Sequence, residues 1–94
     1  MILRPLALAL LAFPALHAHA ADSYPSKAIR LVVISAPGGT TDVLARVVAQ
    51  HMTESLGQPV IADNRPGGGG INASEITARA NPDGYTLLYA HTAY

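Results

Sequence analysis

The segment from Ile29 to Ser35, "IRLVVIS", constrains the fold of this 94-residue chain more than any other. Apolar and mostly β-branched residues follow one another with only Arg30 between them, so both faces of a strand built from this segment are apolar. Strands of this kind are typical of parallel sheets covered by helices on both sides. The segment therefore predicts an interior strand of an α/β sheet.

The residues after two glycines predict a helix from about Thr41 to Leu56. Thr40 or Thr41 is a suitable N-cap, Asp42 falls in the first turn where the helix dipole favours an acid, and Gly57 marks the end. Apolar residues recur with the spacing of one helical face: Leu44, Val47, Val48, Met52 and Leu56.

The remainder of the chain repeats this alternation. A second strand is expected at residues 59–63 and a third at residues 85–90, "YTLLYA". Between them, Gly67 to Gly70 form a loop, and a second helix follows with Asn72 or Ser74 as its cap. "NPDG" at residues 81–84 indicates a type I turn. The order β-α-β-α-β with short connections predicts an α/β fold with parallel strands joined by right-handed crossovers.

The first twenty residues differ from the rest and indicate a secretory signal peptide. Arg4 is their only charge, residues 6–16 are apolar apart from Pro14, and Ala18 and Ala20 are the small residues that a signal peptidase reads. A membrane span is the weaker interpretation, because the apolar run is short and broken by proline. We expect cleavage after Ala20 or Ala21 and a periplasmic product, without disulfide or lipid anchor because cysteine is absent.

Each glycine loop leaves the carboxyl end of a predicted strand and enters a helix, which is where open α/β sheets bind ligands. Backbone N–H groups at a helix start bind anions through hydrogen bonds and the helix dipole. The sequence therefore predicts an anion site formed by residues 37–42 and 67–72. Six basic and six acidic side chains balance, so charge gives no reason to expect nucleic acid as a partner.

Other functions find little support in the residues. Neither loop has the Lys and Ser/Thr pair of a Walker phosphate loop, and the match of residues 68–73 to the dinucleotide pattern G-x-G-x-x-A is weak. No nucleophile elbow or zinc-protease motif occurs, and neither His51 nor His91 belongs to a recognisable catalytic motif. We expect no catalytic residue, metal or cofactor. An exported α/β enzyme, or a binder of phosphate compounds, is the alternative.

Three segments carry a resemblance to a known family. "PGGTTDVLAR" at residues 37–46, "NRPGGGG" at residues 64–70 and "PDGYTL" at residues 82–87 resemble the start of the Bug (TctC-like) family of extracytoplasmic solute receptors of tripartite tricarboxylate transporters. The likeness runs from Tyr24 to about Ala90.

The resemblance implies a periplasmic-binding-protein fold of type II-like topology, in which two lobes close over a small carboxylate and deliver it to a membrane permease. Such receptors are not enzymes and are usually monomers. The implied ligand is a di- or tricarboxylate, an acidic amino acid or a related compound. The implied ligand-binding residues are Ser35, Ala36, Gly38, Gly39, Thr40, Asp42, Gly69, Gly70 and, more weakly, Thr92.

Two features depart from the family pattern. Relatives commonly have Pro-Phe where this chain has Ile34 and Ser35, which implies a more polar contact at Ser35. A two-lobed receptor is also about three times as long as this chain. We therefore expect residues 21–94 to be the N-terminal part of the first lobe, without the second lobe, in a truncated copy with little binding of its own.

Overall fold

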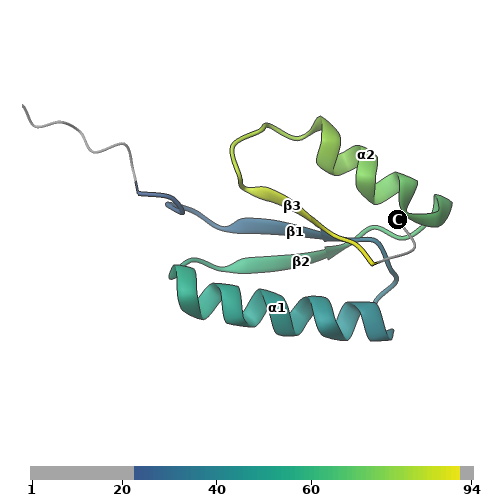
Figure 1. Cartoon of the computed structure of the whole chain (residues 1–94), viewed down its shortest axis with the longest axis horizontal. Coiled ribbons are helices and arrows are strands. Elements are labelled where there is room, and N and C mark those ends of the chain that lie inside the picture. Colours follow the sequence, from purple (N-terminus) through teal and green to yellow (C-terminus); the bar gives the residue numbers. More distant parts are fainter. Residues whose placement is uncertain (1–22, 92–94) are drawn as a thin grey trace, which may run out of the picture.

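A computed structural model describes residues 23–91, so the predicted signal peptide and Thr92 lie outside the described residues. The elements follow the predicted order (Figure 1), with ends shifted by one or two residues. In chain order, the elements are β1 (Ile29–Val33), α1 (Thr40–Leu56), β2 (Val60–Asn64), the short 3-10 helix η1 (Gly68–Gly70), α2 (Ile71–Arg79) and β3 (Thr86–Tyr89). Within residues 23–91 no helix is long and apolar enough to cross a membrane.

The three strands form one sheet in the order β2-β1-β3, and both pairings are parallel, as predicted. Val33 at the end of β1 lies opposite Asn64 of β2 on one side and Tyr89 of β3 on the other. The apolar segment that indicated an interior strand is therefore the central strand of the described sheet.

Side chains of β1 alternate between two cores, one on each face of the sheet. Ile29, Leu31 and Val33 pack with Ala45 and Ala49 of α1. Val32 and Ile34 instead pack with Ala73 of α2. The two helices lie on opposite sides of the sheet (Figure 1), which explains why both faces of β1 are apolar.

The apolar residues that indicated α1 do not form its buried face. Leu44, Val47 and Val48 are 51%, 47% and 39% exposed, whereas Ala45 and Ala49 are buried against the sheet. Alanine side chains let a helix approach a sheet closely, and α1 carries apolar residues on two adjacent faces, so spacing alone does not identify the buried one. Met52 does pack against the core, and Leu56 is 36% exposed.

Glycine, not a polar side chain, caps the start of both helices. Gly39 is the N-cap of α1 and Gly70 that of α2, and neither cap makes a side-chain hydrogen bond, so the predicted caps at Thr40 or Thr41 and at Asn72 or Ser74 are wrong. Asn72 lies inside α2, and its amide donates to the carbonyl of Pro66. At the other end of α1 the prediction is confirmed, since Gly57 is its left-handed C-cap.

The segment before β1 is held against the turn that precedes β3. The hydroxyl of Tyr24 donates to the carbonyl of Gly84 at 2.6 Å, and the Tyr24 and Tyr85 rings lie 5.0 Å apart. The Ser26 amide donates to the Tyr85 hydroxyl at 2.8 Å. In the turn itself the Asp83 amide donates to the Asn81 carbonyl, so the hydrogen bond spans three residues where a type I turn spans four.

Candidate functional site

Two glycine loops follow the carboxyl ends of neighbouring strands, at the same end of the sheet. The first glycine loop (residues 35–39) follows β1, and the second glycine loop (residues 67–70) follows β2 shortly after its end. Because β1 and β2 are adjacent and parallel, their carboxyl ends lie together, and the Arg65 amide donates to the Val33 carbonyl at 2.8 Å just beyond the last strand pair. The structure thus brings the two predicted anion-binding segments to one end of the sheet.

The first glycine loop turns sharply into α1. Gly38 has a φ of +94°, a conformation that favours glycine, and Gly39 returns to extended backbone with φ −83° and ψ 175°. The amides of Thr40 and Thr41 then begin the helix and have no partner inside it. The residues from Ala36 to Thr40 are exposed. This loop therefore presents backbone donors and threonine hydroxyls at a positive helix end.

The second glycine loop has four consecutive residues with positive φ, from +60° at Gly68 to +113° at Gly67. The Gly70 amide donates to the Gly67 carbonyl at 3.1 Å, which closes a tight turn. Gly69 is exposed and Gly70 is buried. Gly67 and Gly68 are exposed like Gly69, so the backbone of these three residues is open to a ligand, while Gly70 supports the turn as the cap of α2.

Asp42 faces protein groups. The residue is 4% exposed, and its carboxylate accepts hydrogen bonds from the Gly38 amide at 3.0 Å, from Asn64 Nδ2 at 2.8 Å and from Arg46 Nε at 3.1 Å. Asn64 Nδ2 also donates to the Ser35 carbonyl at 3.0 Å, and Arg46 Nη2 donates to Asn64 Oδ1 at 3.1 Å. We name Asp42, Arg46 and Asn64 the aspartate cluster.

The aspartate cluster favours the ionised form of its acid. The hydrogen bond from the Gly38 amide and then that from Asn64 lower the pKa of Asp42 to about 2, with a further contribution from Arg46 and with burial opposing them. Asp42 is therefore a carboxylate at neutral pH, with its negative charge already satisfied within the protein.

The hydroxyl of Ser35 is buried, and no hydrogen-bond partner for it is recorded among residues 23–91. It lies at the carboxyl end of β1, next to the exposed Ala36. A buried hydroxyl without a partner is uncommon, because leaving it unpaired costs about 1–3 kcal/mol. Ser35 is thus the predicted site residue with an unused hydrogen-bonding group.

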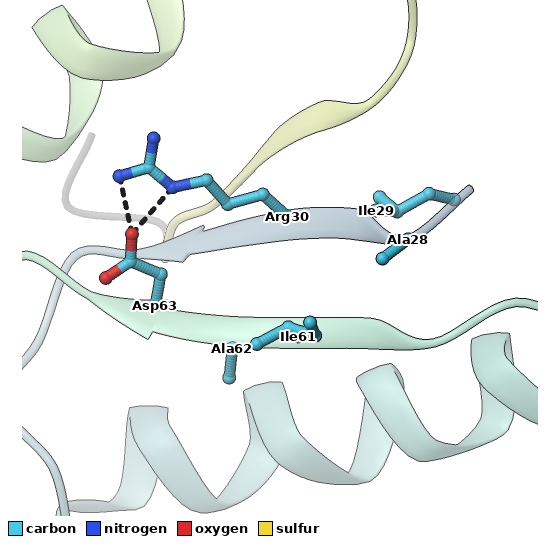
Figure 2. A pocket seen from close by; sticks show the side chains of 6 residues that line it. All are labelled: Ala28, Ile29, Arg30, Ile61, Ala62 and Asp63. Atoms are coloured by element: carbon cyan, nitrogen blue, oxygen red, sulfur yellow. Dashed lines mark hydrogen bonds and ion pairs between the residues drawn. The ribbon is translucent and has the colours of Figure 1, made fainter.

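A second charged cluster lies beside the site. Arg30 Nε donates to Asp63 Oδ2 at 2.6 Å and Arg65 Nε to Asp63 Oδ1 at 3.0 Å. Burial opposes ionisation of Asp63, yet these two guanidinium groups hold its pKa below the ordinary value. Arg30 and Asp63 help to line a surface hollow of about 390 Å³, together with Ala28, Ile29, Ile61 and Ala62. Figure 2 shows the paired side chains of Arg30 and Asp63 and the other residues that line it.

Arg46 and Asn64 are the residues of this region that sequence reasoning missed as site residues. One signal was available for Arg46, because an acid and a base at positions i and i+4 of a helix face one another. Asn64 could not be found in this way, since its contact with Asp42 depends on the pairing of β1 with β2. Among residues 23–91 no group of three His, Cys, Asp or Glu side chains is arranged to hold a metal ion.

Comparison with known proteins connects this geometry to one family. Residues 44–94 match the model of the tripartite tricarboxylate transporter family receptor, TctC. Protein BugT of Bordetella pertussis is 48% identical over 73 residues, which are 78% of this chain and 22% of BugT. The chain thus spans about a fifth of the length of this relative.

Solved structures agree with the sequence matches. A structure described as a periplasmic transporter is 61% identical with a TM-score of 0.63. A protein of R. palustris solved with adipate is 42% identical with a TM-score of 0.67, and MatC of Rhodopseudomonas palustris, solved with malate, is 42% identical with a TM-score of 0.66. Each match covers 69% of this chain and 22% of the other. The proteins of this family are transport receptors and not enzymes, and the chain belongs to the TctC family of tripartite tricarboxylate transporter receptors.

Proposed function

We propose that this chain supplies one side of a carboxylate-binding site in a periplasmic receptor that serves a tripartite tricarboxylate transporter. The ligand is a small di- or tricarboxylate, an acidic amino acid or a related compound, and a membrane permease is the partner that receives it. Export through a cleavable signal peptide at residues 1–20 is part of the same proposal. The relatives solved with adipate and malate support the choice of ligand class.

One observation carries this proposal. Two glycine loops follow the carboxyl ends of adjacent parallel strands, and the first enters α1 through the exposed residues Ala36 to Thr40. We assign direct contacts to the backbone of Ala36, Gly39 and Thr40 and of the second-loop residue Gly69. Gly38 and Gly70 instead shape the two loops, since their amides donate to Asp42 and to the Gly67 carbonyl. Ser35 and Thr92 complete the set of proposed contacts. Such donors recognise the negative charge of a carboxylate, and other parts of the receptor would distinguish one carbon skeleton from another.

The experiment uses a chimaera, because the chain spans 22% of its structural relatives. Residues 24–91 replace the matching segment of the adipate-bound R. palustris protein, and calorimetry measures binding of adipate, malate, glutamate and a sugar phosphate. We expect the chimaera to bind dicarboxylates and to ignore the phosphate. A folded chimaera that binds no carboxylate, or that prefers the sugar phosphate, contradicts the proposal.

Thr40→Pro in this chimaera tests the backbone donor directly. Proline is tolerated at the first position of a helix, and the extended backbone of Gly39 suits a residue before proline, so the substitution removes one N–H while α1 is retained. A hydrogen bond to a charged group contributes about 1.5–3 kcal/mol, so we expect about 10- to 100-fold weaker binding. Thr40→Ala is the matched control, which removes the hydroxyl and keeps the N–H. Equal affinities of the two variants would exclude the backbone contact at Thr40.

A further inference from the structure

We propose that Asp42 does not touch the ligand and instead positions the first glycine loop, while Arg46 and Asn64 connect that loop to the end of β2. This inference rests on the proposed function. It assigns a role to three residues whose contacts are all within the protein.

The carboxylate of Asp42 has no free side to offer a ligand. Oδ2 accepts from the Gly38 amide and from Arg46 Nε, while Oδ1 accepts from Asn64 Nδ2 and, in a bifurcated bond, from the same Arg46 nitrogen. The residue is 4% exposed. A second carboxylate placed beside it would be repelled, since like charges at close range are unfavourable. Direct contact with an anionic ligand is therefore the less favourable role.

The bond to Gly38 acts on the donors proposed to bind the ligand. Gly38 precedes Gly39, the cap of α1, and its amide is fixed by an acceptor four residues later in the same helix. Holding Gly38 at a φ of +94° sets the direction in which the Gly39 and Thr40 amides point. Donors whose direction is set before binding lose less conformational entropy when the ligand arrives.

Asn64 extends this support to the neighbouring strand. As the last residue of β2, it donates to the Ser35 carbonyl at the start of the first glycine loop and to Asp42 at the start of α1. Arg46, one turn into α1, holds Asn64 Oδ1. The aspartate cluster thus ties the end of β1, the start of α1 and the end of β2 into one unit, from which the chain continues towards the second glycine loop.

The test compares four variants of the chimaera that carries residues 24–91: Asp42→Asn, Arg46→Gln, the double variant, and Asp63→Asn. Asp63→Asn is the matched control, because it likewise neutralises a carboxylate held by arginine, but Asp63 contacts neither glycine loop. We expect adipate affinity to fall about 10-fold or more in Asp42→Asn and Arg46→Gln, and the double variant to lose little beyond either single variant, since the residues act as one unit. Asp63→Asn should retain the affinity.

The outcomes separate this inference from the proposed function. If the unmodified chimaera folds and binds no carboxylate, the proposed function fails. If it binds adipate and Asp42→Asn binds equally well or more tightly, or if Arg46→Gln leaves affinity unchanged, the positioning role fails. Tighter binding by Asp42→Asn would indicate a carboxylate that faces the ligand and repels it.

A measurement without ligand keeps the inference testable if a chimaera variant does not fold. Amide hydrogen exchange in the full 94-residue chain should become faster at Gly38 and Gly39 in Asp42→Asn and stay unchanged there in Asp63→Asn. Unchanged exchange at Gly38 in Asp42→Asn would overturn the positioning role, because the bond from that amide to the Asp42 carboxylate is its central contact.

Discussion

At the scale of single residues, the structure depends on a few polar groups and glycines that each hold two parts of the chain together. Asp42 holds the first glycine loop to α1, and the Gly84 carbonyl accepts a hydrogen bond from the Tyr24 hydroxyl, which joins the turn before β3 to the segment before β1. Both contacts can be tested directly. Protonation weakens the contact of Asp42, and the methyl group added by Gly84→Ala disturbs the contact with Tyr24.

The free energy of unfolding should fall as the pH is lowered below about 4, because the pKa of Asp42 is lowered from 3.8 to about 2. A carboxyl group with a depressed folded-state pKa contributes its full stability above the unfolded value and loses it as pH falls towards the folded one. Urea unfolding of residues 21–94 between about pH 6 and pH 2 measures this slope. Asp42→Asn should flatten it, and an unchanged slope would contradict the assignment. Part of the slope should remain, since the pKa of Asp63 is also lowered.

Gly84→Ala should destabilise the protein more than Gly57→Ala. Both glycines have positive φ, +83° and +74°, where a residue with a Cβ costs about 1–2 kcal/mol. A Cβ at Gly84 would in addition lie 3.2 Å from the ring of Tyr24, whereas none of the described atoms lies within 4 Å at Gly57. Chemical denaturation compares the two variants. In a Tyr24→Ala background the difference should vanish, and equal costs in the native background would refute the role of the ring.

At the scale of elements, α1 is the helix whose surroundings are least complete. Its sheet-facing side is formed by alanines and by Asp42, while Val43, Leu44, Val47 and Val48 are exposed by 39% or more. Neighbouring exposed apolar side chains of this kind promote association between protein molecules. The exposed side of α1 is therefore expected to influence how residues 21–94 behave in solution.

Leu44→Lys and Val48→Lys should reduce self-association of residues 21–94 without lowering the free energy of unfolding by more than about 0.5 kcal/mol, as is usual for surface positions. Light scattering over a range of concentrations provides the measurement. Gln50→Lys, at an exposed polar position of the same helix, adds the same charge and removes no apolar surface. If it reduces association equally, charge and not the apolar surface is responsible.

At the scale of elements, most of the secondary structure could be predicted from the sequence, but the buried side of α1 could not. The strands, helices and their order followed from β-branched runs, helical spacing and glycines, and the interior position of β1 followed from its two apolar faces. The buried side of α1 did not, because alanine and leucine both fit a helical period and only packing against the sheet distinguishes them. The glycine turn at Gly38 was predicted from sequence, but the contact of Asp42 with Asn64 could not be, because it depends on the pairing of β1 with β2.

At the scale of the whole molecule, the described sheet has one central strand and two edges. β1 bonds to both neighbours, while β2 and β3 each have one partner among residues 23–91. The residues of β1 are mostly buried, and those of β3 are half-buried or exposed. Local stability should follow this order, since unfolding free energy varies with burial and hydrogen bonding along a structure.

Native-state hydrogen exchange of residues 21–94 should be slowest at Leu31 and Val33 of β1 and faster at Leu87 and Tyr89 of β3. Nuclear magnetic resonance resolves the amides individually. Equal protection of β1 and β3 would contradict this order. Repeating the measurement at lower protein concentration provides the control, because pairing of β3 with another molecule would protect its amides only at high concentration.

The pairing of β1 with β2 gives the aspartate cluster a consequence for folding fidelity. Asp63 and Asn64 are neighbours in β2, and because side chains alternate along a strand they serve opposite faces of the sheet, one with Arg30 and the other with Asp42. A slip of β2 by one residue could place the Asp63 carboxylate where the Asn64 amide now donates to Asp42, next to another buried negative charge. The misaligned pairing is therefore less stable than the native one, because it brings two carboxylates together and also exposes Val60. The residues that shape the first glycine loop thus also favour the correct register of the sheet beneath it.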